Sequence, residues 1–257
     1  MIFTGVMRCE LSKAPWRNVG LWRTFVERYP TVPAAFFWLS APRPRPTRAQ
    51  ATRWAQDYRW PLDHRAGEGY DLRPEEDGLW QSIARLNRDF DGRATMYYIN
   101  QFGWSADVLG ALDPGAATFG DLRCGADVEV GLSIYEPFGI APLEPFAAGA
   151  TCLLSDSCGC ARHLESLGLA DQVLLGAFSR HHFSPREVDA RRLQRIEQAA
   201  YDGLVTALGE RLGLSEPRLD AGPWRQRRAT RIAAAQQAVK RLSWAAAVEH
   251  GLLPALT

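Results

Sequence analysis

Two glutamates, Glu136 and Glu144, stand eight positions apart between two apolar runs, over residues 130–135 and 150–154. Each run has the length and apolar character of a buried strand. A proline and a glycine soon after Glu136 give a turn signal, and the small residues that follow favour a helix start. The sequence therefore predicts strand, turn, helix and strand. One carboxylate would lie at the strand end and the second about two turns into the helix.

This arrangement suits a ligand that carries both hydroxyl groups and negative charge. In a parallel sheet, ligands bind at the edge formed by the carboxyl ends of the strands. Carboxylates there can accept hydrogen bonds from hydroxyl groups, and amides at a helix N-terminus favour phosphate. We expect the amides of Gly139, Ile140 and Ala141 to face a phosphate. Glu136 could also be an ordinary strand-end charge, and Glu144 a solvated helix residue.

Two cations lie in the loop expected after the first strand, which is predicted over residues 2–7. Arg8 and Lys13 have the spacing Arg-x4-Lys and precede a predicted helix that Ser12 could cap. Fixed cations beside a leaving phosphate stabilise the negative charge that it gains in the transition state. Arg17 is the alternative if the register differs by one turn. Both cations could also be plain surface charges.

Other strand ends offer weaker candidates. Residues 100–104 follow the third predicted strand, and Gln101 there could touch a base or a phosphate, although a turn with a packed tryptophan is equally compatible. Residues 157–159 follow the strand after the two glutamates and could serve either ligand or structure. Cys158 and Cys160 suggest a metal, but their spacing fits no usual zinc pattern, so we expect none.

Strands and helices alternate along most of the chain, which predicts parallel pairing. The expected fold is α/β, a Rossmann-like doubly wound parallel sheet with a C-terminal helical extension. We place the sheet lobe in residues 1–180 and the extension, packed on the same lobe, in residues 181–257. The predicted strands cover residues 2–7, 33–39, 93–100, 118–122, 130–135, 150–154 and 172–176; the predicted helices cover 12–29, 47–58, 75–89, 124–127, a segment ending at 168, 184–212, 224–242 and a short final stretch from 243.

The composition excludes several classes of protein. The 257 residues are 46% hydrophobic and 23% charged, which is ordinary for a globular protein in solution. A formal charge of +1 argues against a broad basic face for duplex nucleic acid. No apolar run approaches the ~20 residues of a membrane span, so we expect a cytoplasmic protein. Five cysteines do not indicate a disulfide framework. Neither a Walker motif nor Gly-x-Gly-x-x-Gly follows the first strand, which argues against ordinary nucleotidases and nicotinamide enzymes.

The stretch Tyr-Glu-Pro-Phe-Gly-Ile-Ala-Pro-Leu-Glu over residues 135–144 resembles the Glu-x7-Glu motif of retaining glycosyltransferases. These enzymes have the two-lobed B-type (GT-B) fold, and the group includes glycogen and starch synthases. The glycogen synthase group also carries an Arg-x4-Lys spacing in its first strand–helix loop. Residues 243–256 are similar to the Ser-Trp helix that closes many members. The resemblance covers residues 1–16, 96–160 and 243–256, and it corresponds to the donor-binding lobe only.

The resemblance implies transfer of a hexose, expected to be glucose, from UDP-glucose or ADP-glucose with retention of configuration. Glu136 would lie beside the donor hexose, Glu144 would bind the ribose, and Arg8 and Lys13 would neutralise the diphosphate. No cofactor and no metal is implied, because the two cations take the place of a metal. The base of the donor is left open, and so is the acceptor, which could be a glucan, a small sugar, a lipid or a protein.

A complete member of this group has an additional N-terminal lobe that holds the acceptor. We therefore expect a separate N-terminal lobe protein as partner. The single lobe should bind nucleotide weakly and turn over slowly by itself, because closure between lobes normally excludes water from the reaction. The alternative is a non-catalytic nucleotide-sugar-binding module or a truncated relic. A phosphorylase-like enzyme is disfavoured, since no lysine stands in a context suited to a Schiff base.

Overall fold

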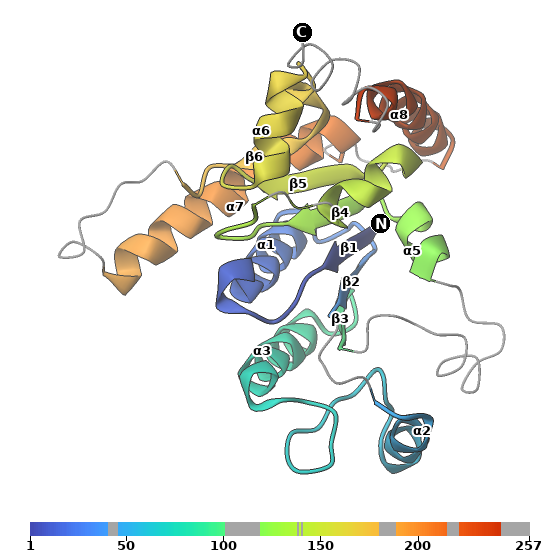
Figure 1. Cartoon of the computed structure of the whole chain (residues 1–257), viewed down its shortest axis with the longest axis vertical. Coiled ribbons are helices and arrows are strands. Elements are labelled where there is room, and N and C mark those ends of the chain that lie inside the picture. Colours follow the sequence, from blue (N-terminus) through green and yellow to red (C-terminus); the bar gives the residue numbers. More distant parts are fainter. Residues whose placement is uncertain are drawn as a thin grey trace, which may run out of the picture.

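The structure is a computed structural model that describes residues 1–40, 46–100, 119–137, 139, 141–179, 189–214 and 221–242. Six parallel strands form one sheet in the order β3-β2-β1-β4-β5-β6 (Figure 1). This confirms the expected doubly wound parallel sheet. The strands are β1 (Ile2–Val6), β2 (Ala34–Leu39), β3 (Ala94–Ile99), β4 (Val128–Gly131), β5 (Thr151–Ser155) and β6 (Leu174–Gly176).

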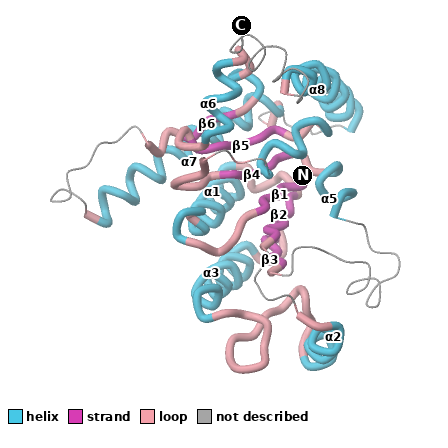
Figure 2. The backbone as a smooth tube through the Cα atoms, viewed as in Figure 1, coloured by secondary structure: helices cyan, strands magenta, loops and turns pink. Residues whose placement is uncertain are grey.

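Helices follow most of the strands and flank the sheet, as the tube in Figure 2 shows. In Figure 1, α1 and α3 lie on one side of the strands and α5 on the other. The α-helices are α1 (Pro15–Arg28), α2 (Arg48–Asp57), α3 (Pro74–Phe90), α5 (Phe119–Gly125), α6 (Gly159–Ser166), α7 (Ala190–Leu212) and α8 (Ala221–Arg241), and the 3₁₀ helices are η1 (Leu11–Lys13), η2 (Ala141–Ala148) and η3 (Ala170–Gln172).

The side chains of the strands alternate between two hydrophobic cores, one on each face of the sheet. Phe3, Val130 and Leu153 belong to the larger core, which the helices α1, α3 and α7 complete. Cys152 and Leu154 belong to the second core, together with residues of α6 and α8. Because helices cover both faces, β5 is buried along its whole length, which explains its uninterrupted apolar sequence.

The order of the strands reverses at β1. The chain proceeds from β1 outward through β2 to β3, then returns to β4 on the other side of β1 and proceeds to β6. At such a reversal the connections after the two central strands leave in opposite directions, and a crevice opens at the carboxyl ends. The segments after β1 and β4 therefore border the same crevice.

Some predicted elements differ from the structure. Residues 119–122, expected to be part of a short strand, lie in the helix α5, which packs against β1 and η2. No strand is added beside β1 there, because β1 already pairs with β2 on one side and with β4 on the other. Ser12 does not cap α1. It lies in η1, and the backbone enters α1 through Ala14, whose φ is +47°.

The C-terminal helices contact the sheet lobe where the structure describes them. The helix α7 begins at Ala190, and the carboxylate of Asp189 accepts hydrogen bonds from the amides of Arg191 and Arg192. It packs against α1 and β6, while α8 packs against η2. The expected helix start at residue 184, the division at residue 180 and the final helix from residue 243 lie outside the described residues.

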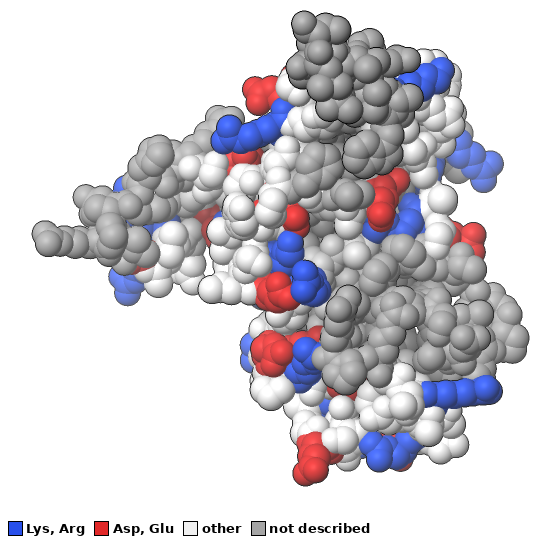
Figure 3. Space-filling view, in the orientation of Figure 1, with Lys and Arg blue, Asp and Glu red and all other residues white. Residues whose placement is uncertain are grey.

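Among the helices that the structure describes, none is long and apolar enough to cross a lipid bilayer. On the face shown in Figure 3, positive and negative side chains are interspersed over the described residues.

A buried carboxylate lies inside the central strand pair. Thr4 of β1 and Glu129 of β4 face each other in the sheet register, and the Thr4 hydroxyl donates a hydrogen bond to the Glu129 carboxylate. Glu129 is fully buried, and its Oε1 lies 3.6 Å from Nη2 of Arg123. Burial raises the pKa of Glu129 to about 7, although the positive charge of Arg123 and the Thr4 hydrogen bond act in the opposite direction.

This raised pKa predicts a dependence of stability on pH. Because the folded protein holds the proton on Glu129 more tightly than the unfolded chain, the residue stabilises the fold below its ordinary pKa of 4.5. That contribution is lost as the pH rises toward 7. Relative to Glu129→Gln, the free energy of unfolding of the wild type should fall by up to roughly 3 kcal/mol between these pH values and level off above.

Urea unfolding of the wild type and of Glu129→Gln at stepped pH measures this difference. Glutamine retains an oxygen that can accept the Thr4 hydrogen bond and carries no charge, so it isolates the titration. A difference that stays constant or grows with pH would show that Glu129 does not titrate in this way.

Candidate functional site

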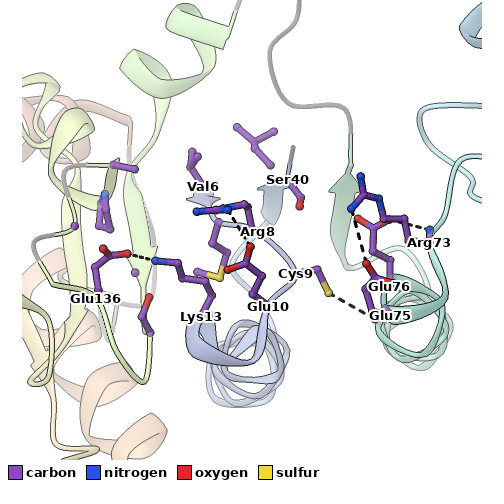
Figure 4. Close-up of a pocket in the computed structure, with 17 residues that line it drawn as sticks. Val6, Arg8, Cys9, Glu10, Lys13, Ser40, Arg73, Glu75, Glu76 and Glu136 are labelled. Carbon is purple, nitrogen blue, oxygen red and sulfur yellow. Dashed lines mark hydrogen bonds and ion pairs between the residues drawn. The ribbon is translucent and has the colours of Figure 1, made fainter. Parts of the chain in front are cut away.

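A cavity of about 820 Å³ opens at the carboxyl ends of β1, β2 and β4, where the strand order reverses (Figure 4). The loop between β1 and α1 contributes Arg8, Cys9, Glu10 and Lys13 to its wall. The segment after β4 contributes Ser133, Glu136 and Gly139, and the start of α3 contributes Arg73, Glu75 and Glu76. Three separate parts of the chain thus supply charged groups to one space.

Lys13 and Glu136 form an ion pair in this cavity, although they are 123 residues apart in the sequence. Their side chains are only 17% and 22% exposed. Partial desolvation strengthens such a pair relative to one on the surface. The structure therefore brings together the two residue types that the sequence places at this edge, one carboxylate and one cation.

Each cation described in the cavity wall has a carboxylate beside it. Arg8 lies 3.0 Å from Oε1 of Glu10, with both side chains largely exposed. Arg73 lies 3.9 Å from Oε1 of Glu75, and Lys13 is paired with Glu136. An anionic ligand that enters the cavity must therefore compete with these carboxylates for the cations.

The segment that carries Glu136 leaves the sheet earlier than the apolar pattern suggests. The strand β4 ends at Gly131, whereas the sequence predicted a strand up to residue 135. The amides of Ile134 and Tyr135 donate hydrogen bonds to the carbonyl of Ser12, at 2.9 and 3.1 Å, instead of continuing the ladder with β5. Glu136 accordingly lies beyond the strand end, in the connection that crosses toward the loop after β1.

Buried polar groups hold this connection in place. The guanidinium of Arg17 donates hydrogen bonds to the carbonyls of Leu132 and Ser133, both at 3.2 Å. The hydroxyl of Ser155, at the end of β5, donates to the same Ser133 carbonyl at 2.6 Å. Arg17, the alternative cation of the sequence analysis, is buried, pairs with Glu197 at 2.9 Å and lies over the Phe178 ring. Its observed contacts are structural.

Glu136 is fixed from the other side by the segment after β5. The backbone of Glu136 forms an isolated parallel bridge with Cys158, and its carbonyl accepts a hydrogen bond from the amide of Gly159 at 2.9 Å. Gly139 adopts φ +81°, and a Cβ there would lie 2.7 Å from both the Cys158 sulfur and the Glu136 Cγ. The glycine is therefore required by backbone conformation and by close approach together.

The helix after Gly139 is of a different type from the one expected. Residues Ala141–Ala148 form the 3₁₀ helix η2, and Pro142 and Pro145 lie within it. Pro145 has no N–H group, so it cannot donate the i→i−4 hydrogen bond that a regular α-helix would have at that position. Gly139 and Ala141 line the cavity, and the Ala141 carbonyl accepts a hydrogen bond from Arg123. Ile140 lies outside the described residues.

Glu144 lies apart from the other predicted site residues. Its side chain is 54% exposed, and Oε2 is 3.3 Å from Nη2 of Arg123. It is not among the described residues that line the cavity, whereas Arg8, Lys13 and Glu136 are. Its role toward a ribose stays a prediction. Gln101, the candidate from the third strand end, lies outside the described residues.

Asn100, directly after β3, has a structural partner. It is completely buried, and its side-chain amide donates hydrogen bonds to the backbone carbonyl and the carboxylate of Asp71. His64 and Tyr58 also contact that carboxylate. Burial by itself would raise the pKa of Asp71, but the interaction with His64 and the hydrogen bonds from Tyr58 and the Arg65 amide hold it below its usual range. The cluster anchors the segment that leads into α3.

The contribution of α3 to the cavity was not predicted from the sequence. Glu76 is almost fully buried and accepts hydrogen bonds from the Tyr98 hydroxyl at 2.6 Å and the Arg73 amide at 3.0 Å. A glutamate three residues after the helix cap was a readable signal for a helix start. Its approach to the cavity depends on the packing of α3 against β3 and α1, which the spacing does not encode.

Cys9 belongs to the cavity wall but is not set up as a nucleophile. Burial, Glu76 and Glu75 together raise the pKa of the Cys9 thiol to about 11. It remains a neutral thiol at pH 7. Cys158 and Cys160 have sulfurs 3.2 Å apart, and no group of three or more metal-ligating side chains occurs among the described residues.

No family model matches the sequence, and no curated protein matches it. The chain is similar to several solved structures. One is the apo structure of OtsA, at 15% identity and a TM-score of 0.49, covering 93% of this chain and 40% of that chain. Another is a trehalose-6-phosphate phosphatase N-terminal domain from Candida albicans, at 12% identity and 0.48, covering 93% and 40%.

A third is a UDP-forming α,α-trehalose-phosphate synthase from Burkholderia xenovorans in complex with glucose-6-phosphate, at 17% identity and a TM-score of 0.47. It covers 93% of this chain and 42% of that chain. The chain thus spans less than half the length of each of these structures. At such identities and scores the similarity assigns neither an activity nor a residue role, which have to stand on the geometry of this chain.

The steric requirement at Gly139 can be measured against a matched glycine. Gly139→Ala and Gly168→Ala both place alanine at positive φ, +81° and +66°, but only position 139 has atoms within 4 Å of the new Cβ. We expect Gly168→Ala to cost about 1–2 kcal/mol of stability from backbone strain. Gly139→Ala should cost more, because the Cβ forces Glu136 and Cys158 apart. Thermal or urea unfolding of both variants measures this, and equal losses would contradict it.

Proposed function

We propose that this chain is the nucleotide-sugar-binding lobe of a retaining glycosyltransferase of the GT-B type, similar to the glycogen synthases. The observation that carries the proposal is the meeting of Lys13 and Glu136 in one cavity at the reversal of the strand order. A nucleotide sugar needs a cation for its diphosphate and an acceptor for its sugar hydroxyls, and these two residues supply one of each. The motif around Glu136 supports the same assignment.

The size of the cavity agrees with such a ligand. Ligand pockets generally measure about 300–1,000 Å³, and this one measures about 820 Å³. Arg8 and Lys13, from the loop after β1, are proposed to bind the diphosphate. Glu136 is proposed to lie beside the hexose. Gly139, at positive φ, lines the cavity in the turn that follows Glu136.

The ion pairs in the cavity suggest how binding proceeds. The diphosphate replaces Glu136 as the partner of Lys13 and replaces Glu10 as the partner of Arg8. Glu136, once released, can accept hydrogen bonds from the hydroxyl groups of the donor sugar. As the bond to the sugar breaks, the diphosphate gains negative charge, and the nearby ammonium of Lys13 stabilises that charge. One exchange of partners thus prepares both ends of the donor.

Transfer of the sugar requires an acceptor, which in this proposal is held by a second lobe. Closure of two lobes around a donor excludes water and favours transfer over hydrolysis. We propose UDP-glucose or ADP-glucose as donor, with the hexose transferred with retention of configuration. The separate acceptor lobe is part of the same proposal.

The exchange of ion-pair partners makes opposite predictions for Lys13 and Glu136. Lys13→Gln removes a charge-assisted contact with the diphosphate and should weaken UDP or ADP binding about tenfold, or about 1.4 kcal/mol. Glu136→Gln removes the carboxylate that competes for Lys13. It should therefore leave nucleotide affinity unchanged or strengthen it several-fold, by roughly 0.5–1 kcal/mol. Isothermal titration calorimetry with UDP and with ADP measures both effects.

Arg23→Gln and Glu165→Gln are matched controls, because each makes the same change of charge at an exposed helix position. Both should bind as the wild type does. The proposal fails if neither nucleotide binds, or if Lys13→Gln binds as tightly as Arg23→Gln. Weaker nucleotide binding by Glu136→Gln would contradict the proposed exchange of ion-pair partners, but it would not contradict the nucleotide site itself.

The proposed ribose contact of Glu144 has a separate test. Glu144→Ala should weaken UDP and ADP binding about tenfold, since the loss of a hydrogen bond to a charged group costs ~1.5 kcal/mol. Pyrophosphate, which has no ribose, should bind Glu144→Ala as it binds the wild type. Equal weakening for pyrophosphate and UDP would place the effect on the diphosphate instead. Comparison of UDP and ADP in the same titrations identifies the preferred base.

A further inference from the structure

A second cavity, of about 630 Å³, lies at the amino ends of β5 and β6, whereas the first lies at the carboxyl ends of the strands. Its wall includes Thr151, the first residue of β5, and Asp171 and Gln172, which precede β6. The last turn of α7 and one side of α8 complete the described part of the wall. The proposed donor site lies at the carboxyl ends of the strands, so the two cavities share no described residue.

The described wall of this cavity is cationic. It contains Arg211 of α7 and Arg227 and Arg231 of α8, with one carboxylate, that of Asp171. Arg211 donates hydrogen bonds to the backbone carbonyls of Asp171 and Gln172, at 2.7 and 3.0 Å. These contacts orient its guanidinium through uncharged carbonyl groups, and Asp171 is the carboxylate that acts on its charge.

Arg231 lines this cavity and has buried donors without a hydrogen-bond partner among the described residues. Its Nε donates to the carbonyl of Gly149 at 3.2 Å. Its Nη1 and Nη2 are buried and have no hydrogen-bond partner among the described residues. Burial lowers the pKa of Arg231; the neighbouring positive charges of Arg228, Arg227 and Arg211 lower it further, although Asp127 opposes them. Buried donors without acceptors are costly unless a ligand supplies the acceptors.

Thr151 adds an independent observation. Its residue is only 2% exposed, and its hydroxyl has no hydrogen-bond partner among the described residues, yet it belongs to the wall of the cavity. A buried hydroxyl is rarely left without a partner in a protein. Thr151 and Arg231 therefore place an uncharged and a charged donor group, both buried and unpartnered among the described residues, in the wall of the same cavity.

From this geometry we infer a second binding site, for the phosphate group of a phosphate monoester. Phosphate offers several acceptor oxygens and a double negative charge, which matches guanidinium groups and a hydroxyl. The cavity is also larger than a bare anion needs, and its size is within the range for small organic ligands. The inference does not rest on the proposed function, because no residue of the donor site takes part.

Calorimetric titration of the full chain with glycerol 3-phosphate tests the site. Gln226 lines the cavity on α8 with an exposed side chain, so Gln226→Glu places a negative charge there without disturbing the core. It should weaken binding about fivefold or more, by repulsion of the dianion. Gln236→Glu makes the same change at an exposed position of α8 outside the described wall, and its affinity should stay within about twofold.

Arg231→Gln is the second variant and should weaken binding about tenfold, through the loss of a charge-assisted contact. Circular dichroism establishes that it is folded. Arg23→Gln should bind glycerol 3-phosphate as the wild type does, because Arg23 is exposed and lies in neither described cavity wall. Lys13→Gln tests whether the proposed donor site takes the phosphate instead. The inference is overturned if binding is not saturable, if Gln226→Glu and Arg231→Gln both bind as the wild type, or if Lys13→Gln abolishes binding.

Two further titrations separate the possible sources of the phosphate group. Glycerol should not bind, which shows that the phosphate is needed. Inorganic phosphate should bind more weakly than glycerol 3-phosphate, because it leaves the rest of the cavity unfilled. If inorganic phosphate binds as tightly, the site belongs to free phosphate and the assignment to a monoester is wrong.

Discussion

The parallel pairing of β1 with β4 is the constraint on which the rest of the structure depends. It is the point at which the sheet reverses its order, and it brings the loop after β1 beside the segment after β4. Lys13 and Glu136 meet only because these two strands are neighbours. A buried carboxylate, Glu129, lies inside this same strand pair, hydrogen-bonded to Thr4 and close to Arg123. The same pair of central strands therefore holds a buried carboxylate and positions the residues of the candidate site.

The candidate site is held in shape before any ligand enters. The connection after β4 receives hydrogen bonds from Arg17 and Ser155 and donates to Ser12, so three different segments fix its course. The described cations of the cavity wall lie beside carboxylates, which keeps the empty site close to electrical neutrality. Such pairing limits the cost of gathering several charges in a partly buried space, and a ligand that carries its own negative charge can take over the cations.

The two cavities differ in charge, and they lie at opposite ends of the strands, one at the carboxyl ends and the other at the amino ends. The one at the carboxyl ends has cations and carboxylates in near balance, whereas the described wall of the other has three arginines and one aspartate. The helix α8 packs on η2 and contributes Arg227 and Arg231 to the second cavity. A single sheet can therefore present two chemically distinct sites, because the segments that follow its strands differ from the segments that precede them.

The sequence by itself determined the alternation of strands and helices, and from this the doubly wound sheet followed. Apolar runs such as residues 150–154 predicted buried strands, because strands covered on both faces contain few polar residues. The spacing of Arg8, Lys13 and Glu136 placed charges at strand ends, and parallel strands collect such ends at one edge.

Tertiary structure alone decided where those strands stopped and which side chains met. The strand β4 ends at Gly131 because Ser12, far away in the sequence, offers its carbonyl to the following amides. Glu144 lies on the 3₁₀ helix η2, beside Arg123 and outside the described cavity wall, although its spacing from Glu136 suggested a common site. The contribution of α3 to the cavity also depends on packing. A local pattern reports the preferences of a segment, whereas these outcomes depend on partners that only the folded chain brings near.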